Sequence, residues 1–336
     1  MKTKAFLAAS LATGLVLAAK VGAAPPDRPP EPIDYLDVFL GMPLTLGVLS
    51  RPSGNPYLNR AVIYGGYNGS ASLTDGLERN MSTLGNATLI SGMSGTAQSD
   101  GRASGNDSRM VVGENSAIYW AQASLGASTT FGNLSNGRAA VGHTHNQTRI
   151  IYAGGLINTS NQTTVDYRTI ATVGTAVSFG TLSSARRTID GRISNGTRGL
   201  TAGGWTNSSS ATNRIDYWTF ATTGNATQFG SLTSSRERPV GGSSNTRGVF
   251  GSNNATTHDY VTIATTGNAT SFGTITAQIW RMSCSNGSRV LWTPSMTSPS
   301  TAMLYVNIAT TGNAQSFGST PAARYYANPA TGFFGV

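Results

Sequence analysis

Cysteine, lysine and histidine are scarce in this chain. Its 336 residues include one cysteine, Cys284, which excludes an intrachain disulfide and a cysteine-based metal cluster. A secreted protein of this size often carries disulfides, so their absence favours synthesis in the cytoplasm. Charged residues make up 11% of the sequence, and there are three histidines. Few groups are therefore present for acid–base catalysis.

One phrase recurs along the chain. Its clearest form is IDYWTFATTGNATQFG at Ile215–Gly230, and Val165–Gly180 and Leu304–Gly318 carry close versions. Successive copies begin about 42 to 50 residues apart, the spacing of propeller repeats. The seven copies begin at Ile33, near Asp75, and at Ile118, Val165, Ile215, His258 and Leu304. The sequence therefore predicts several copies of one small unit.

Each copy reads as four short β-strands. An arginine opens an apolar run that ends in small residues, as in Arg198–Gly204, and a polar loop follows. The next strand alternates in the period-2 pattern of a half-buried strand. Thr-Gly-Asn then marks a tight turn, and the returning strand carries Phe-Gly. A weaker strand such as Arg238–Gly242 completes the unit. Four strands in a repeat of this length predict a propeller blade.

The two ends of the repeat series are complementary. Ile33–Arg51 reads as the second half of a blade, and Arg324–Val336 reads as the first half. Pairing two strands from each end would complete a seventh blade and remove exposed sheet edges. We therefore expect an all-β, seven-bladed β-propeller at residues 33–336, preceded by an extended or helical arm at residues 1–32.

The repeat resembles the kelch repeat. The shared features are a Gly pair after an apolar strand (Gly154-Gly155, Gly203-Gly204), an Asp-Tyr strand, an aromatic residue on the next strand and a trailing Arg. The aromatic position, usually Trp, is occupied here by Phe131, Phe179, Phe229, Phe272 and Phe317. The full wording of the phrase is similar to that of kelch-like propellers of tailed phages, especially marine ones. This resemblance implies a place on a virion surface.

The amino-terminal segment has two interpretations. Lys2 and Lys4, the apolar run Ala5–Ala19 and the small residues Val21–Ala24 are typical of a secretory signal. An apolar arm followed by a proline-rich spacer would instead suit a docking anchor, and it is short for a membrane span. The side chains expected to dock are Phe6, Leu7, Leu11, Leu15, Val16 and Leu17.

The arginines outnumber the acids. All three lysines precede residue 25, so residues 25–336 carry 20 Arg against 14 acidic residues, a net charge of +6. Such a body can attract nucleic acid or an anionic cell surface. However, the charges are phased with the repeat, and the phased positions are Arg149, Arg198 and Arg247, and Asp34, Asp166, Asp216 and Asp259. We therefore expect arginine hydrogen bonds to backbone carbonyls or to these carboxylates, and no binding of nucleic acid.

Motifs for chemistry are weak. His143 and His145 have metal-like spacing, but a third ligand is not evident nearby, and His258 belongs to another repeat. A glycosidase would need two carboxylates about 5 to 9.5 Å apart. The acids of the weakest repeat region are Asp75, Glu78, Asp100, Asp107 and Glu114. We predict no catalytic residue, no metal and no cofactor, and hydrolysis of a polysaccharide remains an alternative.

Asparagine-rich loops that follow the arginine strands should collect on one rim of the propeller. Loops on rigid scaffolds often bind ligands, and amides beside an indole suit a sugar. The candidate binding residues are Asn158, Asn161, Trp205, Asn207, Asn253, Asn254 and Trp292. The abundant Asn-x-Ser/Thr sequences have a compositional explanation in a chain built from Asn, Ser and Thr turns.

These patterns predict a non-enzymatic virion component. Residues 1–32 would dock onto other virion proteins, and a multi-copy propeller would face outward, protecting the particle or holding a host-surface glycan or protein. The alternative is a secreted or periplasmic bacterial binding propeller with a cleaved signal. A polysaccharide-acting enzyme is the third reading.

Overall fold

The chain divides into two compact units, residues 1–50 and 51–336, and each is described by itself. The computed structural model describes two amino-terminal strands and residues 57–97, 102–187, 189–207, 210–251, 256–275, 282–293, 300–324 and 327–331. In the first unit, β1 (Leu7–Ser10) pairs antiparallel with β2 (Val16–Ala19). The predicted arm is thus a β-hairpin at these residues. The boundary predicted at residue 32 lies outside the described residues and stays a prediction.

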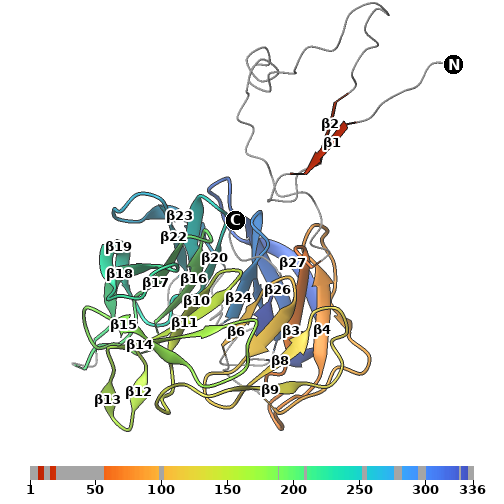
Figure 1. Cartoon of the computed structure of the whole chain (residues 1–336), viewed down its shortest axis with the longest axis horizontal. Helices are drawn as coiled ribbons and strands as arrows, with labels where there is room; N and C mark the ends of the chain where they lie inside the picture. The colour runs from red at the N-terminus through yellow and green to blue at the C-terminus, as the bar shows by residue number, and fades with distance from the viewer. Residues whose placement is uncertain are drawn as a thin grey trace, which may run out of the picture. The chain divides into compact units, whose positions relative to one another are not determined.

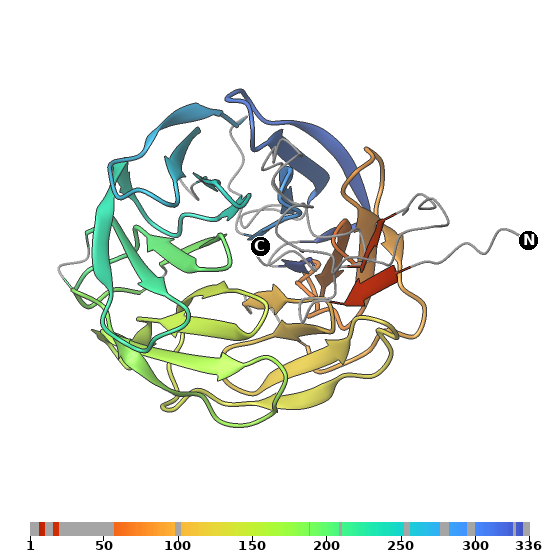
Figure 2. The same ribbon diagram turned by 45° about the horizontal axis from the view of Figure 1, so that its top comes forward.

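The second unit is a β-propeller. Six four-stranded antiparallel sheets surround a common centre (Figures 1 and 2). In the described residues all regular structure is β-strand, and no helix there has the length and hydropathy to cross a membrane. The blades in chain order are blade 1 (β28, β3, β4, β5), blade 2 (β6 to β9), blade 3 (β10, β11, β14, β15), blade 4 (β16 to β19), blade 5 (β20 to β23) and blade 6 (β24 to β27).

Each blade contributes strands in the order expected from the repeat. The inner strands are β28 (Asn328–Ala330), β6 (Ala103–Gly105), β10 (Gly142–His145), β16 (Asp190–Ser194), β20 (Gly241–Ser243) and β24 (Met282–Ser285). The second strands are β3 (Arg60–Tyr64), β7 (Arg109–Val112), β11 (Arg149–Ala153), β17 (Arg198–Ala202), β21 (Arg247–Phe250) and β25 (Arg289–Thr293). Every second strand begins at the arginine that the sequence marks.

The third and outer strands carry the Asp-Tyr and Phe-Gly phrases. The third strands are β4 (Gly76–Asn80), β8 (Ala117–Ala121), β14 (Thr164–Thr169), β18 (Thr212–Thr219), β22 (Thr257–Thr262) and β26 (Ser300–Asn307). The outer strands are β5 (Thr88–Leu89), β9 (Thr129–Gly132), β15 (Val177–Thr181), β19 (Thr227–Arg236), β23 (Thr270–Thr274) and β27 (Gln315–Arg324). A small hairpin of β12 (Leu156–Ile157) and β13 (Ser160–Asn161) projects from blade 3.

The ring of described residues has six blades, not the predicted seven. β28 pairs with β3, so blade 1 joins one carboxy-terminal strand to three amino-terminal strands. Blade 6 meets blade 1 directly, because Gly85 N–H donates to the Phe317 carbonyl at 2.8 Å. We expected two strands from each end of the chain to share a blade. The structure instead joins one carboxy-terminal strand, β28, to three amino-terminal strands. Ile33–Arg51, on which the seventh blade depended, lies outside the described residues, as does Gly332–Val336.

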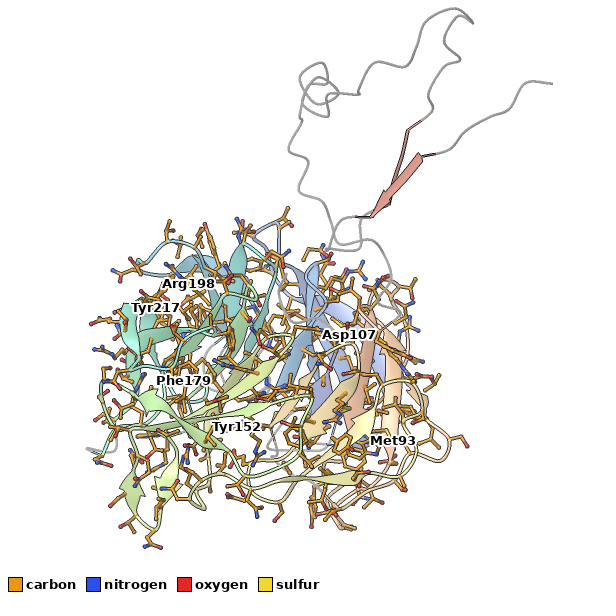
Figure 3. The ribbon with its side chains drawn as sticks, in the orientation of Figure 1. Met93, Asp107, Tyr152, Phe179, Arg198 and Tyr217 are labelled. Carbon is orange, nitrogen blue, oxygen red and sulfur yellow. The ribbon has the colours of Figure 1, made fainter. Side chains whose placement is uncertain are left out.

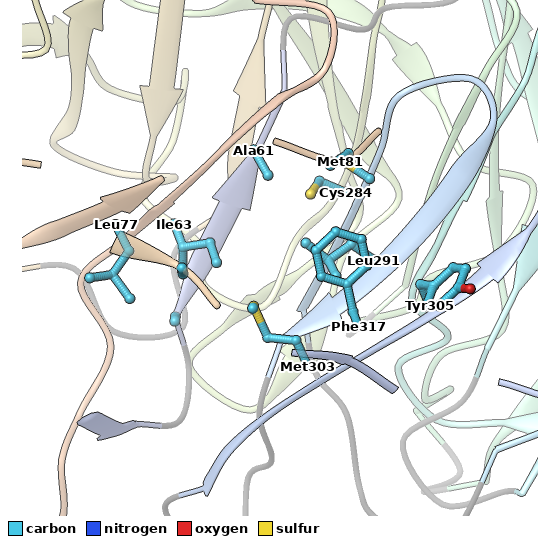
Figure 4. Close-up of a cluster of buried hydrophobic side chains, with 11 residues drawn as sticks. Ala61, Ile63, Leu77, Met81, Cys284, Leu291, Met303, Tyr305 and Phe317 are labelled. Carbon is cyan, nitrogen blue, oxygen red and sulfur yellow. The ribbon is translucent and has the colours of Figure 1, made fainter. Parts of the chain in front are cut away.

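The hydrophobic core consists of six clusters, one between each pair of neighbouring blades. Alternate residues of a second strand enter different clusters: Ile150 faces blade 2, and Ile151 faces blade 4. Figure 4 shows the cluster between blades 6 and 1, where Cys284 lies with Ile63 and Phe317. Burial raises the pKa of the Cys284 thiol to about 12, so the thiol is an unreactive part of the core.

The Thr-Gly-Asn turn joins one blade to the preceding one, and we call this contact the clasp. In blade 5, Gly267 N–H donates to the Phe229 carbonyl at 2.9 Å, and Asn268 Oδ1 accepts the Ser231 N–H at 3.0 Å. The Gly after Phe is required because a Cβ on Gly230 would lie 2.0 Å from the Gly267 carbonyl oxygen. The same Gly–Phe bond joins Gly85 to Phe317, Gly174 to Phe131, Gly224 to Phe179, and Gly312 to Phe272. The recurrent phrase is thus an inter-blade contact as well as a turn.

Candidate functional site

The centre of the ring is almost filled. Residues from all six inner strands line a cavity of about 20 Å³, close to the volume of one water molecule. Arg192 extends from β16 across this space, and its Nη1 donates to the carbonyls of Ser283 at 2.6 Å and Pro329 at 3.0 Å. Its backbone has φ +49° at a bulge in β16. The central cavity is too small for an organic substrate.

Hydroxyl groups hold the inner strands to one another. Ser243 Oγ donates to the Ser194 carbonyl at 2.8 Å, and the Ser243 N–H donates to Ser285 Oγ at 3.1 Å. Thr331 Oγ1 donates to the Ser285 carbonyl at 2.6 Å, and Thr144 repeats this contact with the strand of blade 4. Because the hydroxyls satisfy backbone groups, they act as inter-strand contacts.

The two histidines with metal-like spacing have structural surroundings. His143 Nε2 lies 2.8 Å from the Ala103 carbonyl oxygen, and burial together with the charges of Arg192 and Arg102 holds its pKa well below the usual range. His145 lines the central cavity. His258, in blade 5, stacks on Trp292 with ring centres 4.7 Å apart. Among the described residues, no group of three His, Cys, Asp or Glu side chains is placed to bind a metal ion.

The phased aspartates form buried ion pairs between blades. A second arginine series, named here the buried arginines, supplies the partners. The pairs are Arg138–Asp166 at 2.7 Å, Arg186–Asp216, Arg236–Asp259 at 2.8 Å and Arg324–Asp75 at 3.0 Å. In the first three pairs both side chains are at most 1% exposed. Such charges are tolerated inside a protein only when they are paired. Asp34 lies outside the described residues.

The described acids of residues 75–114 each contact a different partner. Asp75 binds Arg324, and Glu78 binds Arg60. Asp107 and Glu114 lie at opposite ends of β7; Asp107 accepts a hydrogen bond from Gln147, and Glu114 lies 3.2 Å from Arg102. Asp100 lies outside the described residues. Each described acid therefore has its own donor.

The predicted rim residues are only partly brought together. Asn161 is buried, and its Nδ2 donates to the Trp205 carbonyl at 2.9 Å, while its N–H donates to Asn207 Oδ1 at 3.0 Å. These residues join the loops of blades 3 and 4. Asn158 is exposed in the tight turn between β12 and β13, with φ +52°. Asn253 and Asn254 lie outside the described residues.

Trp292 is a core residue, and its assignment to the rim was wrong. It is 1% exposed on β25 and packs in the cluster between blades 5 and 6. The error has a physical cause, because a second strand is covered by a neighbouring blade on both faces. An aromatic residue there is buried even when polar loops follow it closely in sequence.

The arginines that open the second strands form a different series. We call five of them, Arg109, Arg149, Arg198, Arg247 and Arg289, the groove arginines. The sixth, Arg60, pairs with Glu78 at 2.6 Å and is left out of this series. Each guanidinium lies over a tyrosine of its own blade, with 4.9 Å from Arg198 Cζ to the centre of the Tyr217 ring (Figure 3). Each also donates from Nη1 to a carbonyl of the next blade, as Arg247 does to Ala309 at 2.8 Å. The expected arginine–carbonyl bonds are thus confirmed.

A short turn places each groove arginine. Asn146 Oδ1 accepts the N–H groups of Thr148 at 2.9 Å and Arg149 at 2.8 Å, forming an Asx turn. Asn195 holds Arg198 in the same way, and Ser244 does so for Arg247. All second strands begin on one face of the ring, so the groove arginines lie on that face, which we call the groove face.

Polar grooves lie between blades on the groove face. A groove of about 300 Å³ is lined by Arg149 with Asn146 and Thr148 of blade 3 and with residues of blade 4, among them Thr197 and Phe220. A second, of about 660 Å³, is lined by Arg247 with residues of blades 5 and 6. Neither groove has an acidic lining residue. Each therefore offers one cation surrounded by hydroxyl and amide groups.

Sequence reasoning missed three features. The crossing Arg192 and the inter-strand hydroxyls have no periodic signal strong enough to separate them from ordinary polar residues. The grooves had a signal, the recurrent Asn-x-Thr/Ser-Arg tetrapeptide ending at Arg149 and Arg198. Its arginines were expected in structural hydrogen bonds alone. Comparison with known proteins adds nothing further: no protein-family model matches the chain, and no curated protein is significantly similar to it.

Proposed function

We propose that this protein is a non-enzymatic binding propeller carried on the surface of a virion. The binding role rests on one observation. The described carboxylates and imidazoles that could serve in catalysis are instead engaged in structural contacts. Asp166, Asp216 and Asp259 are buried in ion pairs, and His143 bonds a backbone carbonyl. A central cavity of about 20 Å³ also favours a surface ligand over an enclosed substrate.

The virion location rests on sequence. The DYxTIATTGNATxFG wording resembles kelch-like propellers of tailed phages, and that kelch-like assignment is part of the proposal. Residues 1–32 would dock onto other virion proteins, and the propeller would face outward in many copies. Multiple copies raise the overall strength of weak individual contacts. The outward face would hold a host-surface glycan or protein, or protect the particle.

The test is the intact mass of the protein from its native source, measured in particle fractions and in free protein. We expect full-length protein in the particle fractions. Free protein that lacks about the first 24 residues would instead indicate an exported binding propeller with a cleaved signal, as the segment Ala5–Ala24 also suggests.

A second measurement addresses the enzymatic alternative. Purified protein is incubated with acidic and neutral polysaccharides, and new reducing ends are measured. We expect none. Hydrolysis that is lost in a Glu114→Gln variant would overturn the non-enzymatic assignment.

A further inference from the structure

We propose that the groove face binds an anionic polysaccharide through the groove arginines. This inference rests on the proposed binding function and names its ligand class and surface. The ligand would be a linear glycan bearing carboxylate or sulfate groups. It would lie across successive blades, with its acidic groups at the guanidinium groups and its hydroxyls at the surrounding threonine, serine and asparagine side chains.

The first support is the unused donor capacity of the groove arginines. A guanidinium has five N–H donors. Arg149 and Arg247 each use Nη1 for carbonyls of the next blade, and no hydrogen bond from their Nε or Nη2 is found within the described residues. Both arginines are half-buried, which leaves these donors next to solvent. Donors of this kind suit a carboxylate or sulfate, which accepts two parallel bonds.

The second support is electrostatic. The buried arginines are neutralised by aspartates, whereas no ion pair is found for the groove arginines within the described part of the chain. The five groove arginines therefore add positive charge to the groove face that no described carboxylate pairs with. The grooves at Arg149 and Arg247 present two cationic sites to one polymer, so weak single contacts add within one complex. The groove at Arg60 differs, because Glu78 lines it and pairs with the arginine.

The third support separates a polysaccharide from a nucleic acid. Single-stranded nucleic acid is usually held by bases stacked on free aromatic faces. On the groove face the tyrosines are already in use: Tyr217 lies between Arg198 and Phe229, and Tyr260 lies between Arg247 and Phe272. The groove linings instead provide hydroxyls and amides, which match the hydroxyl groups of a sugar.

The test uses the full-length chain and four immobilised polymers: polygalacturonate for carboxylates, dextran sulfate for sulfates, neutral dextran, and duplex DNA. Binding is measured by biolayer interferometry over a range of salt concentrations. The groove variant is Arg149→Gln/Arg247→Gln, which removes the cation of each described groove. The control is Arg187→Gln/Arg238→Gln, which removes the same number of charges from the loops that lead into β16 and β20, on the opposite face. There Arg187 bonds Asn161 Oδ1, and Arg238 pairs with Glu237. Urea unfolding checks that both variants are folded.

We expect binding to one or both acidic polysaccharides and not to neutral dextran, with affinity that falls as salt rises. The groove variant should bind about tenfold more weakly and with a smaller salt dependence, whereas the control should stay within about twofold. The preferred polymer identifies the acidic group. Equal losses in both variants would overturn the proposal, because net charge alone would then explain binding. Equally tight binding to DNA that is lost in the same variant would reassign the grooves to nucleic acid.

The polymer-binding test and the particle-fraction test can fail separately. Full-length protein in particle fractions that binds none of the polymers would sink the polysaccharide inference and leave the virion role standing. Polysaccharide binding by a processed, particle-free protein would support the inference and exclude the virion location.

Discussion

The two arginine series use one residue type in opposite ways. The buried arginines sit between blades, and Arg138 and Arg186 are fully buried with Asp166 and Asp216. The groove arginines lie half-buried over tyrosines, bond backbone carbonyls and have no carboxylate partner within the described residues. Arginine serves both roles because its head is planar, permanently charged and rich in donors. Burial with a carboxylate indicates a structural role, and exposure with spare donors indicates a surface that can bind.

The largest expected effect comes from breaking a buried pair. Asp216→Ala removes the carboxylate that Arg186 and Arg214 share, and leaves a buried guanidinium without its counter-ion. We expect a loss of about 3–5 kcal/mol in the free energy of unfolding, measured by urea denaturation. In the control Arg186→Met/Asp216→Leu both charges leave the interior, so the loss should be smaller. A double variant as unstable as Asp216→Ala would contradict this explanation.

Lowering the pH should also reduce the stability of the folded ring, through a buried histidine. Burial, together with the charge of the buried arginine Arg236, lowers the pKa of His258 from 6.5 to about 4. Between these two pKa values the unfolded chain binds the proton and the folded chain does not. The stability that depends on neutral His258 is therefore fully present above pH 6.5 and is lost as the pH falls towards 4. The contribution is about 3 kcal/mol.

The measurement is the free energy of unfolding of wild type and His258→Phe at about pH 7 and about pH 4.5. Phenylalanine keeps an aromatic ring against Trp292 and cannot titrate. The variant should lose less stability on acidification. Buried His143, whose pKa is also lowered, leaves a remaining dependence of the same sign. Identical pH profiles would show that His258 does not titrate as described.

The clasp gives the next effect. Gly230→Ala places a Cβ 2.0 Å from the Gly267 carbonyl oxygen, so blades 4 and 5 must separate locally. We expect a loss of about 1–3 kcal/mol in urea denaturation. Gly267→Ala is the matched control, because nothing lies within 4 Å of the Cβ that it adds. Equal stability of the two variants would show that the close approach of the Gly267 carbonyl does not explain the glycine after Phe229.

The smallest stability effect belongs to the groove face. Arg198→Gln removes hydrogen bonds to the Ile263 and Ala264 carbonyls and the contact with Tyr217. Because water can replace these bonds at a half-exposed site, we expect a loss of at most about 1 kcal/mol in the same assay. A loss as large as that of Asp216→Ala would make the two arginine series equally structural and remove the contrast between them.

Much of the fold could be predicted because the repeat is strong. The arginine that opens each second strand, the Asp-Tyr third strand and the Phe-Gly outer strand all lie where the pattern placed them, as Arg198, Asp216 and Phe229 show. Such positions have local causes, namely alternation, turn residues and Asx turns. The candidate site was less predictable. Asn161 and Trp292 both neighbour polar loops in the sequence, but loop residues of blade 4 contact Asn161, whereas Trp292 is buried in the core between blades 5 and 6.

Sequence alone determined that the chain forms repeated four-stranded units with a second strand starting at a phased arginine. Only the tertiary structure decided the number of blades in the described ring, the joining of β28 to β3, the partner of each arginine and the crossing of the centre by Arg192. The physical reason is the range of the interactions. Strand and turn preferences act over a few neighbouring residues, whereas ring closure and charge pairing join residues that are far apart in the chain, as Arg324 and Asp75 are.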